Sequence, residues 1–239
     1  MNRLMGIWER FPPHRLLVEV SLWSADFSRL GEEIARMDPF ADLYHVDASD
    51  GHLVPGLLFF PDLIAALRPL TTKPFHVHLM VGQPIAYISE FVQAGADLLT
   101  IQVENGPLVP AALEQACSLG VVPGLALGLD SPVEVLPPYL DRVGMLLLMG
   151  TPLGVKGVEP SGLVYERVRQ VRRLVDQEGY RERVKIGADG GIRQHSVPQL
   201  RAAGADLVVA GSLAFKSPRP AETFNWLWSL PPYDPQRTE

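Results

Sequence analysis

Short apolar segments recur along the chain and alternate with segments of helical periodicity. Eight of them have the length and near-continuous hydrophobicity of buried strands, and they begin at Leu16, Leu43, Phe75, Leu98, Val121, Gly144, Val184 and Leu207. Between them, apolar residues three and four positions apart, such as Val168, Val171 and Val175, form the stripe of a helix that can cover a sheet. Strands that alternate with helices throughout predict an α/β fold with a parallel sheet.

Proline and glycine residues mark the expected ends of these helices. Helices are expected to begin at Pro84 and Pro160, because proline suits the first helical turn. Glycine suits a left-handed C-cap, and the periodic segments are followed by Gly95, Gly120, Gly179 and Gly204. The tripeptide Ala-Asp-Leu also opens three predicted strands, at positions 41, 96 and 205. This indicates that the same connection into a strand is used repeatedly.

Eight strand-helix units predict a single (β/α)8 TIM barrel, because about 200 residues suffice to close such a barrel. We expect residues 1–239 to form one domain with its core at about 16–215, an N-terminal extension and a proline-rich C-terminal tail. In that tail, Phe224, Leu227 and Trp228 indicate a short last helix. An open doubly wound sheet is the alternative. It is disfavoured because SLWSADF follows the first strand instead of a glycine-rich dinucleotide-binding turn.

Composition and charge exclude several classes of function. Hydrophobic residues make up 47% of the chain and charged residues 20%, which supports a sizeable core and argues against disorder. The formal net charge of −6 disfavours nucleic acid and anionic membranes as partners. The first twenty residues lack the apolar run of a signal peptide, and no apolar segment reaches the length of a membrane span. With Cys117 as the single cysteine, no intrachain disulfide can form, and we expect a cytoplasmic protein.

Side chains that can bind a metal stand at the carboxyl ends of three predicted strands. His45 and Asp47 lie on one face of the segment LYHVD, and His76 and His78 repeat this spacing in FHVHL. Asp189 follows VKIGA, and barrel closure would bring it opposite the first pair. Nitrogen and oxygen ligands without sulfur suit one divalent ion of zinc, iron, manganese or cobalt. We expect this ion on His45, Asp47, His78 and Asp189.

Nearby polar residues have simpler interpretations. Asp50 and His52 lie in ASDGHLVP, where Asp-Gly is a common turn pair, so we favour a turn. Glu104 also ends a strand, and a loop hydrogen bond is its expected role. Gln102, beside it, receives no assignment.

Glycine residues after the last two strands predict a phosphate site. Gly190 and Gly191 follow the seventh strand, and Gly211 and Ser212 follow the eighth. These two loops commonly build the phosphate site of a barrel, and bare glycine lets backbone amides approach the phosphate oxygens.

The loop after the sixth strand, MGTPLGVKGVEP, is long and contains Gly154 and Gly157. This is typical of a mobile lid whose amides, or whose Lys156 side chain, contact the substrate. A surface loop without function is the alternative.

From about Val18 to Phe215 the chain resembles the ribulose-phosphate 3-epimerases of the ribulose-phosphate-binding barrel superfamily. The resemblance is carried by SLWSADFSRLGEE, HVDASDGHLVP, HVHLM, AGADLLTIQVE, ADGGI and AGADLVVAGS. It implies a small phosphorylated ketose as substrate and a homo-oligomeric assembly.

The resemblance also implies roles for the candidate residues. Ser21 joins the active site, the four metal ligands keep their role, and Asp47 and Asp189 exchange protons with the substrate. Inverting a carbon beside a ketone requires proton removal on one face and return on the other, which two opposed carboxylates can perform. The implied metal would stabilise the negative charge of the enediolate. The phosphate is held by Gly190, Gly191, Gly211 and Ser212, and the reacting centre is lined by Met80 and Met149.

We therefore expect a metal-dependent isomerase that epimerises carbon 3 of a ketose phosphate, with D-ribulose 5-phosphate and D-xylulose 5-phosphate as the expected pair. Ser49, Gly56 and Lys156 stand where the family usually has methionine, asparagine and glycine. Another ketose phosphate, such as D-allulose 6-phosphate, is therefore the first alternative. A non-catalytic sugar-phosphate-binding barrel is the second, although binding alone does not need both aspartates. A decarboxylase of the same superfamily is supported by fold analogy alone.

Overall fold

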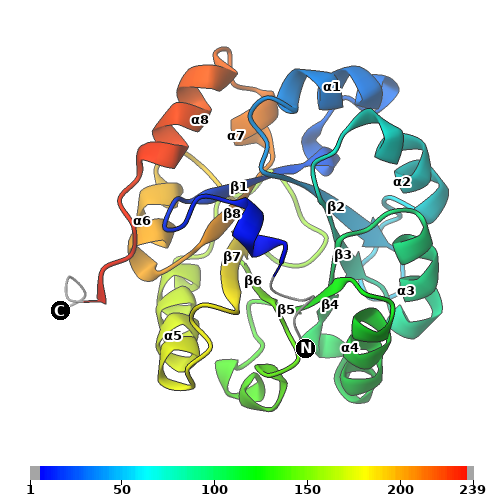
Figure 1. Ribbon diagram of the computed structural model, residues 1–239, viewed down its shortest axis with the longest axis vertical. Helices are drawn as coiled ribbons and strands as arrows, with labels where there is room; N and C mark the ends of the chain where they lie inside the picture. Colours follow the sequence, from blue (N-terminus) through cyan, green and yellow to red (C-terminus); the bar gives the residue numbers. More distant parts are fainter. Residues whose placement is uncertain (1–5, 236–239) are drawn as a thin grey trace.

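Eight parallel strands close into a barrel in the computed structural model, which describes residues 6–235 (Figure 1). The strands are β1 (Leu17–Ser21), β2 (Leu43–Ser49), β3 (Phe75–Met80), β4 (Leu98–Gln102), β5 (Val122–Leu127), β6 (Met145–Met149), β7 (Lys185–Asp189) and β8 (Leu207–Ala210). Strand β1 pairs with both β2 and β8, so the sheet has no open edge. The TIM barrel prediction is confirmed, and the doubly wound alternative is wrong.

Helices connect the strands and surround the barrel (Figure 1). The α-helices are α1 (Leu30–Met37), α2 (Pro61–Leu67), α3 (Pro84–Gln93), α4 (Val109–Ser118), α5 (Leu163–Gln177), α6 (Ser196–Ala203), α7 (Ser212–Phe215) and α8 (Pro220–Ser229). Shorter 3-10 helices are η1 (Trp8–Arg10), η2 (Leu22–Ser24), η3 (Phe27–Arg29), η4 (Arg68–Leu70), η5 (Val103–Leu108), η6 (Val133–Val135) and η7 (Pro137–Tyr139). Only η6 and η7 join β5 to β6, because prolines in SPVEVLPPYL remove amide donors that an α-helix needs.

The predicted helix boundaries are correct with one exception. Helix α3 begins at Pro84, and α6 is capped by Gly204, whose φ of 112° is a left-handed conformation that favours glycine. The prediction of a helix start at Pro160 is wrong, since α5 begins at Leu163. Pro160 instead packs against the β7–α6 loop, where a Cβ on Gly191 would lie 2.5 Å from its nitrogen.

The repeated Ala-Asp-Leu tripeptide is one hydrogen-bonded joint used three times. Its aspartates, Asp42, Asp97 and Asp206, each accept a hydrogen bond of 2.9 Å from an amide at the start of the preceding strand, on Val18, Phe75 and Ile186 respectively. The same aspartates pair with Arg15, Arg68 and Arg172 at 2.6, 3.1 and 2.6 Å. Each joint therefore ties two neighbouring strands together at the end of the barrel where the strands begin.

The N-terminal extension closes that same end of the barrel. Trp8 is 7% exposed and belongs to an apolar cluster with the first residues of several strands, among them Leu17, Leu43 and Leu207. Figure 1 shows the segment lying across the barrel opening. The described part of the extension, from residue 6 onward, is thus the floor of the barrel, whereas residues 1–5 lie outside the described residues. The functional residues lie at the opposite end.

The expected last helix is α8, in which Phe224 and Leu227 are buried. No helix within residues 6–235 combines the length and apolar character needed to cross a membrane.

Candidate active site

Four potential metal ligands meet at the carboxyl end of the barrel. His45 and Asp47 lie on β2, His78 on β3 and Asp189 at the end of β7. The register of the two parallel strands places Asp47 directly beside His78. One ligand atom from each of the four residues lies within 4.8 Å of all the others. The structure thus brings together, from three separate strands, the four residues that the sequence predicts as metal ligands.

The distances between these ligand atoms are short. His45 Nε2 lies 3.3 Å from Asp47 Oδ1 and 3.7 Å from Asp189 Oδ2. His78 Nδ1 lies 3.4 and 3.9 Å from the same two oxygens. Ligands at about 2.0–2.2 Å from one tetrahedral metal are separated by about 3.3–3.6 Å. The spacing of the four groups is therefore close to that of ligands sharing one cation.

The outer nitrogens of the two imidazoles determine where their protons lie. His45 Nδ1 is 2.8 Å from Glu19 Oε2 and donates to that carboxylate. His78 Nε2 is 2.5 Å from the Gln102 side chain, whose amide oxygen accepts when its nitrogen donates to Glu104 Oε2 at 2.7 Å. In its neutral form each ring therefore carries its proton on the outer nitrogen and turns a lone pair inward.

The inward-facing nitrogens lack partners of their own. Within residues 6–235, no hydrogen-bond partner is found for His45 Nε2 or His78 Nδ1, and both atoms are buried. Two lone pairs facing two carboxylate oxygens repel one another unless positive charge lies between them. The donor set and the unpartnered atoms therefore fit a divalent cation.

The two aspartates have pKa values shifted in opposite directions. Burial alone would raise the pKa of Asp47, but the neighbouring His45 and His78 rings more than compensate and hold it well below its usual value. Burial raises the pKa of Asp189 to about 6, and the charge of Asp47 contributes to this rise. Two carboxyl groups whose pKa values differ in this way can serve as proton acceptor and proton donor.

A cation and a proton compete for His45. Burial lowers the pKa of this imidazole, but Asp47 and Glu19 together raise it well above its usual value. A metal can bind Nε2 only after the proton on it has left, so the affinity of the site must depend on pH.

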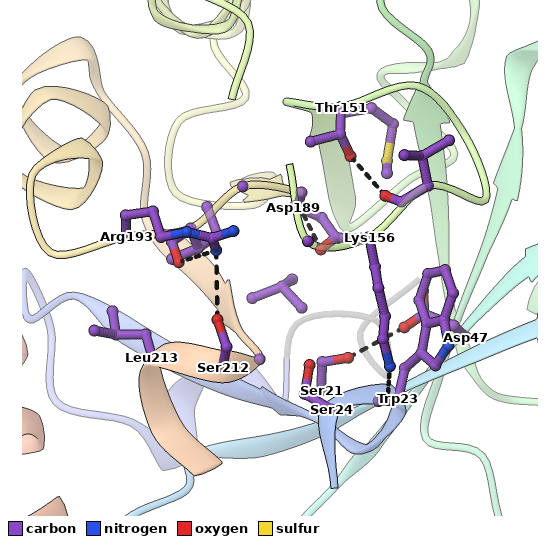
Figure 2. Close-up of a pocket in the computed structure, with 18 of the residues that line it drawn as sticks. Ser21, Trp23, Ser24, Asp47, Thr151, Lys156, Asp189, Arg193, Ser212 and Leu213 are labelled. Carbon is purple, nitrogen blue, oxygen red and sulfur yellow. Dashed lines mark hydrogen bonds between the residues drawn. The ribbon is translucent and has the colours of Figure 1, made fainter. Parts of the chain in front are cut away.

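Both aspartates are held by further hydrogen bonds. Ser21 Oγ, on β1, donates to Asp47 Oδ2 at 3.2 Å, and the amide of Gly190 donates to Asp189 Oδ1 at 2.7 Å (Figure 2). Ser21 thus contacts the site directly, and one oxygen of each carboxylate is left for the ligand cluster.

A cavity of about 550 Å³ opens beside this cluster (Figure 2). The residues expected to bind substrate line it, with one exception, and they are Ser21, Met80, Met149, Lys156, Gly157, Gly190, Gly191, Gly211 and Ser212. The exception is Gly154, which is not among the lining residues. It faces Val54 instead, where an added Cβ would lie 2.9 Å away.

Two cationic residues of the cavity were missed in the sequence. Arg193 and Lys216 line it together with Lys156, while Asp47 and Asp189 are its only lining carboxylates within the described residues. Arg193 Nη1 lies 3.4 Å from Ser212 Oγ, so the loops after β7 and β8 meet here (Figure 2). Their positions shortly after Gly190-Gly191 and Gly211-Ser212 are a signal that could have identified them. The cavity therefore combines two carboxylates with three cationic side chains.

The loop between β6 and α5 is fastened across the cavity by Lys156. Its Nζ donates to the backbone oxygen of Trp23 at 2.8 Å and lies 5.2 Å from the centre of the indole ring. Burial, reinforced by the charge of Lys216, lowers the pKa of this lysine. Figure 2 shows the side chain reaching over to Trp23 beside Asp47.

The remaining polar candidates have structural roles, as expected. Asp50 accepts hydrogen bonds from the amides of His52 and Gly82 at 2.9 and 3.1 Å. Glu104 accepts from the Gly128 amide at 2.8 Å and from the Ser131 hydroxyl. Neither carboxylate belongs to the metal-ligand cluster.

Sequence comparisons identify relatives over the whole barrel. Residues 17–215 match the model of the ribulose-phosphate 3 epimerase family. The ribulose-phosphate 3-epimerase of Bacillus subtilis is 36% identical over 199 residues, covering 83% of this chain and 91% of the relative. That of Synechocystis is 37% identical over 210 residues, covering 87% and 90%. That of Escherichia coli K12 is 34% identical over 204 residues, covering 84% and 90%.

Solved structures with low sequence identity share the fold. Orotidine 5'-phosphate decarboxylase from Pyrococcus horikoshii has a TM-score of 0.59 at 18% identity, covering 89% of this chain and 97% of its own. The tryptophan synthase α-subunit from Pyrococcus furiosus has a TM-score of 0.63 at 17% identity, covering 91% and 96%. These two likenesses concern the barrel alone. The family model and the curated relatives match most of the chain. The chain therefore belongs to the ribulose-phosphate 3-epimerase family of isomerases.

Proposed function

We propose that this protein is a metal-dependent epimerase that inverts carbon 3 of a ketose phosphate, with D-ribulose 5-phosphate and D-xylulose 5-phosphate as its substrate pair. The observation that carries this proposal is the position of Asp47 and Asp189, which reach one ligand cluster from β2 and β7 beside a cavity. The names of the curated relatives support the same reaction.

The two aspartates would carry the proton transfers. One carboxylate removes the proton on carbon 3, and the bonding electrons move into an enediolate spanning carbons 2 and 3. The other carboxyl group then returns a proton to the opposite face of carbon 3. The pKa of Asp47 is lowered and that of Asp189 is raised to about 6, so Asp189 takes up a proton more readily than Asp47 does. In the reverse direction, the two groups exchange roles.

A divalent cation of zinc, iron, manganese or cobalt would be held by His45, Asp47, His78 and Asp189. When bound, it would supply positive charge that stabilises the negative charge developing on the substrate oxygens. Ser21, through its hydrogen bond to Asp47, would keep that carboxylate in position.

The part of the cavity around Arg193 and Ser212 would bind the phosphate (Figure 2). The amides of Gly190, Gly191, Gly211 and Ser212 would contact its oxygens, with Arg193 and Lys216 supplying positive charge nearby. Met80 and Met149 would line the reacting carbon with polarizable, uncharged groups. The loop that contains Gly154, Lys156 and Gly157 would cover the bound sugar.

A second candidate keeps this chemistry on another ketose phosphate, such as D-allulose 6-phosphate. Lys156 favours it, because this residue adds a cation to the cavity at a point where the family usually has glycine. Ser49 and Gly56, the other two departures, are hydrogen-bonded to each other at 2.8 Å and do not line the cavity.

Hydrogen-deuterium exchange followed by NMR tests the reaction and the substrate together. The metal-loaded protein is incubated in heavy water with ribulose 5-phosphate and, separately, with fructose 6-phosphate. We expect exchange at carbon 3 of the pentulose and formation of xylulose 5-phosphate. Exchange with the hexulose alone would favour the second candidate, and exchange with neither would contradict both.

We also infer that the protein assembles as a homo-oligomer. Leu57, Phe60 and Phe27 are 80, 57 and 52% exposed, and such apolar side chains are often covered by another subunit. Light scattering coupled to size-exclusion chromatography tests this inference, and a monomer mass at micromolar concentration would contradict it.

A further inference from the structure

Glu19 is a buried carboxylate that the proposed chemistry does not use. It lies on β1, has 0% exposure, and stands between two histidines. Its Oε2 is 2.8 Å from His45 Nδ1 and 2.9 Å from His76 Nδ1. His76 Nε2 in turn lies 2.7 Å from Thr100 Oγ1. Side chains of β1, β2, β3 and β4 thus form one hydrogen-bonded chain within the barrel.

The chemistry of these groups gives the chain a direction. An ionised carboxylate only accepts hydrogen bonds, so both histidines donate to Glu19 through Nδ1. His76 Nε2 is then free to accept from the hydroxyl of Thr100. His45 Nε2 is left without a proton when the ring is neutral, and this atom is the one that faces Asp47 and Asp189.

We propose that Glu19 is a positioning residue for metal binding, which fixes His45 in the tautomer that presents Nε2 to the cation and holds the ring in that orientation. This inference rests on the proposed function, since it presupposes a cation at His45. Carboxylates behind ligating histidines commonly raise the basicity of the ligand and restrict its ring. His76 holds Glu19 on its other side, and Thr100 in turn holds His76.

The counterpart behind His78 differs in charge. Gln102 is a neutral amide, and it accepts from His78 Nε2 at 2.5 Å. The two ligating histidines therefore have unlike supports, and the charged one stands behind His45. We expect a substitution of Glu19 to weaken the His45 contact specifically.

Glu19, His45 and His76 could also be read as ligands of a second cation, since their ligand atoms lie close together. The separations of 2.8 to 3.0 Å between the carboxylate and the ring nitrogens are those of hydrogen bonds with a proton between the atoms. All three side chains have 0% exposure, and the Nδ1 atoms of both rings already form hydrogen bonds with Glu19. The geometry favours protons over a second metal.

The test compares metal binding by the wild-type protein and by Glu19→Gln, a variant of equal size that lacks the charge. Cobalt(II) is titrated into each protein, with its absorption spectrum reporting coordination and a chelator competition reporting affinity. We expect one cobalt per chain in both and a 10- to 100-fold weaker affinity in the variant. Histidine nitrogen NMR of the zinc-loaded proteins should show the Nδ1 proton of His45 in both, with a shifted resonance and faster exchange with solvent in the variant.

Thr100→Val is the matched control, because it alters the far end of the chain and leaves the contact between Glu19 and His45. Its cobalt affinity should stay much closer to that of the wild type. If Glu19→Gln does not fold, Glu19→Asp retains the charge but withdraws it from His45, and its affinity should also fall.

The outcomes separate this inference from the function on which it rests. A wild-type protein that binds no divalent ion would overturn the proposed metal site and this inference with it. Wild-type binding with equal affinity and an equal spectrum in the Glu19 variants would overturn this inference alone. Two cobalt ions per wild-type chain would also overturn it, because Glu19 would then be a ligand.

Discussion

Asp47 and His78 occupy paired positions on β2 and β3, and Asp47 Oδ1 lies 3.4 Å from His78 Nδ1. The contact follows from the register of the two strands, since side chains at paired positions point to the same face of the sheet. A shift of one residue would turn every side chain of one strand to the opposite face. The strand pairing that closes the barrel therefore also assembles the site.

Replacing either central aspartate with asparagine should abolish turnover and leave the fold intact. Asparagine keeps the size of Asp47 or Asp189 but cannot exchange a proton at neutral pH, so we expect a loss of at least about 100-fold in kcat. The measurement is epimerisation of ribulose 5-phosphate, with circular dichroism as the check on folding. Ser21→Ala, which removes one hydrogen bond to Asp47, should lose far less. Turnover near the wild-type rate in either asparagine variant would rule out the assigned roles.

Metal affinity should fall as the pH is lowered. The raised pKa of His45 means that its imidazole retains a proton at pH values where a free histidine has lost it. Metal binding must displace that proton, so each step toward acid pH weakens binding. Zinc titrations at pH 8, 7 and 6 measure this, and a dissociation constant that does not vary over this range would disagree with it. Removal of the metal with a chelator should stop turnover, and added divalent ion should restore it.

The buried carboxylate of Glu19 should make stability depend on acid pH. Burial alone would raise its pKa, but His76 and His45 lower it from 4.5 to about 2. The carboxylate therefore stabilises the fold fully above about pH 4.5, and this contribution is lost as the pH falls toward 2. It can amount to about 3 kcal/mol, since one pKa unit corresponds to about 1.4 kcal/mol.

Denaturant unfolding of the wild type and of Glu19→Gln between pH 3 and 7, with a chelator present, measures this contribution. The difference in unfolding free energy between the two proteins should be largest at neutral pH and shrink at acid pH. A difference that is the same at both ends of the range would speak against an ionised Glu19 in the folded protein.

Lys156→Gln should weaken substrate binding more than it slows the chemical step. The change removes the positive charge of Lys156, which lies over the Trp23 ring and lines the cavity. We expect KM for the ketose phosphate to rise by about tenfold with a small change in kcat, which is typical of lost ground-state binding. Trp23→Phe keeps an aromatic ring and the backbone oxygen that accepts from Lys156, and it serves as the control. A fall in kcat at unchanged KM would assign Lys156 to the chemistry instead.

The joint formed by Asp206 should be important for stability. Asp206→Ala removes the acceptor of the Ile186 amide and of the buried Arg172 guanidinium at once. We expect a loss of about 1–3 kcal/mol in the free energy of unfolding, because a buried donor would be left without a partner. The control is Glu32→Ala, which breaks an exposed ion pair with Arg29 and should have no measurable effect. Equal stability of the two variants would contradict this role.

The sequence alone determined the strands, their number and the ligand cluster. These features depend on local periodicity, since a period of two puts His45 and Asp47 on one face and an apolar run predicts each buried strand. The order of strands in a closed barrel then specifies which strand ends are neighbours. The family motifs extended these predictions to the chemistry.

The tertiary structure alone decided the contacts between residues far apart in the chain. Glu19 meets His76 across 57 positions and Lys156 meets Trp23 across 133, and no local pattern indicates either pair. A lone glutamate in an apolar strand was visible in the sequence, but its partners depend on the direction in which each strand faces after closure. The same reason explains why no helix starts at Pro160. Its packing against the β7–α6 loop outweighs its local preference for a helix start. Local preferences specify elements, whereas contacts across the barrel depend on the packing of all eight strands together.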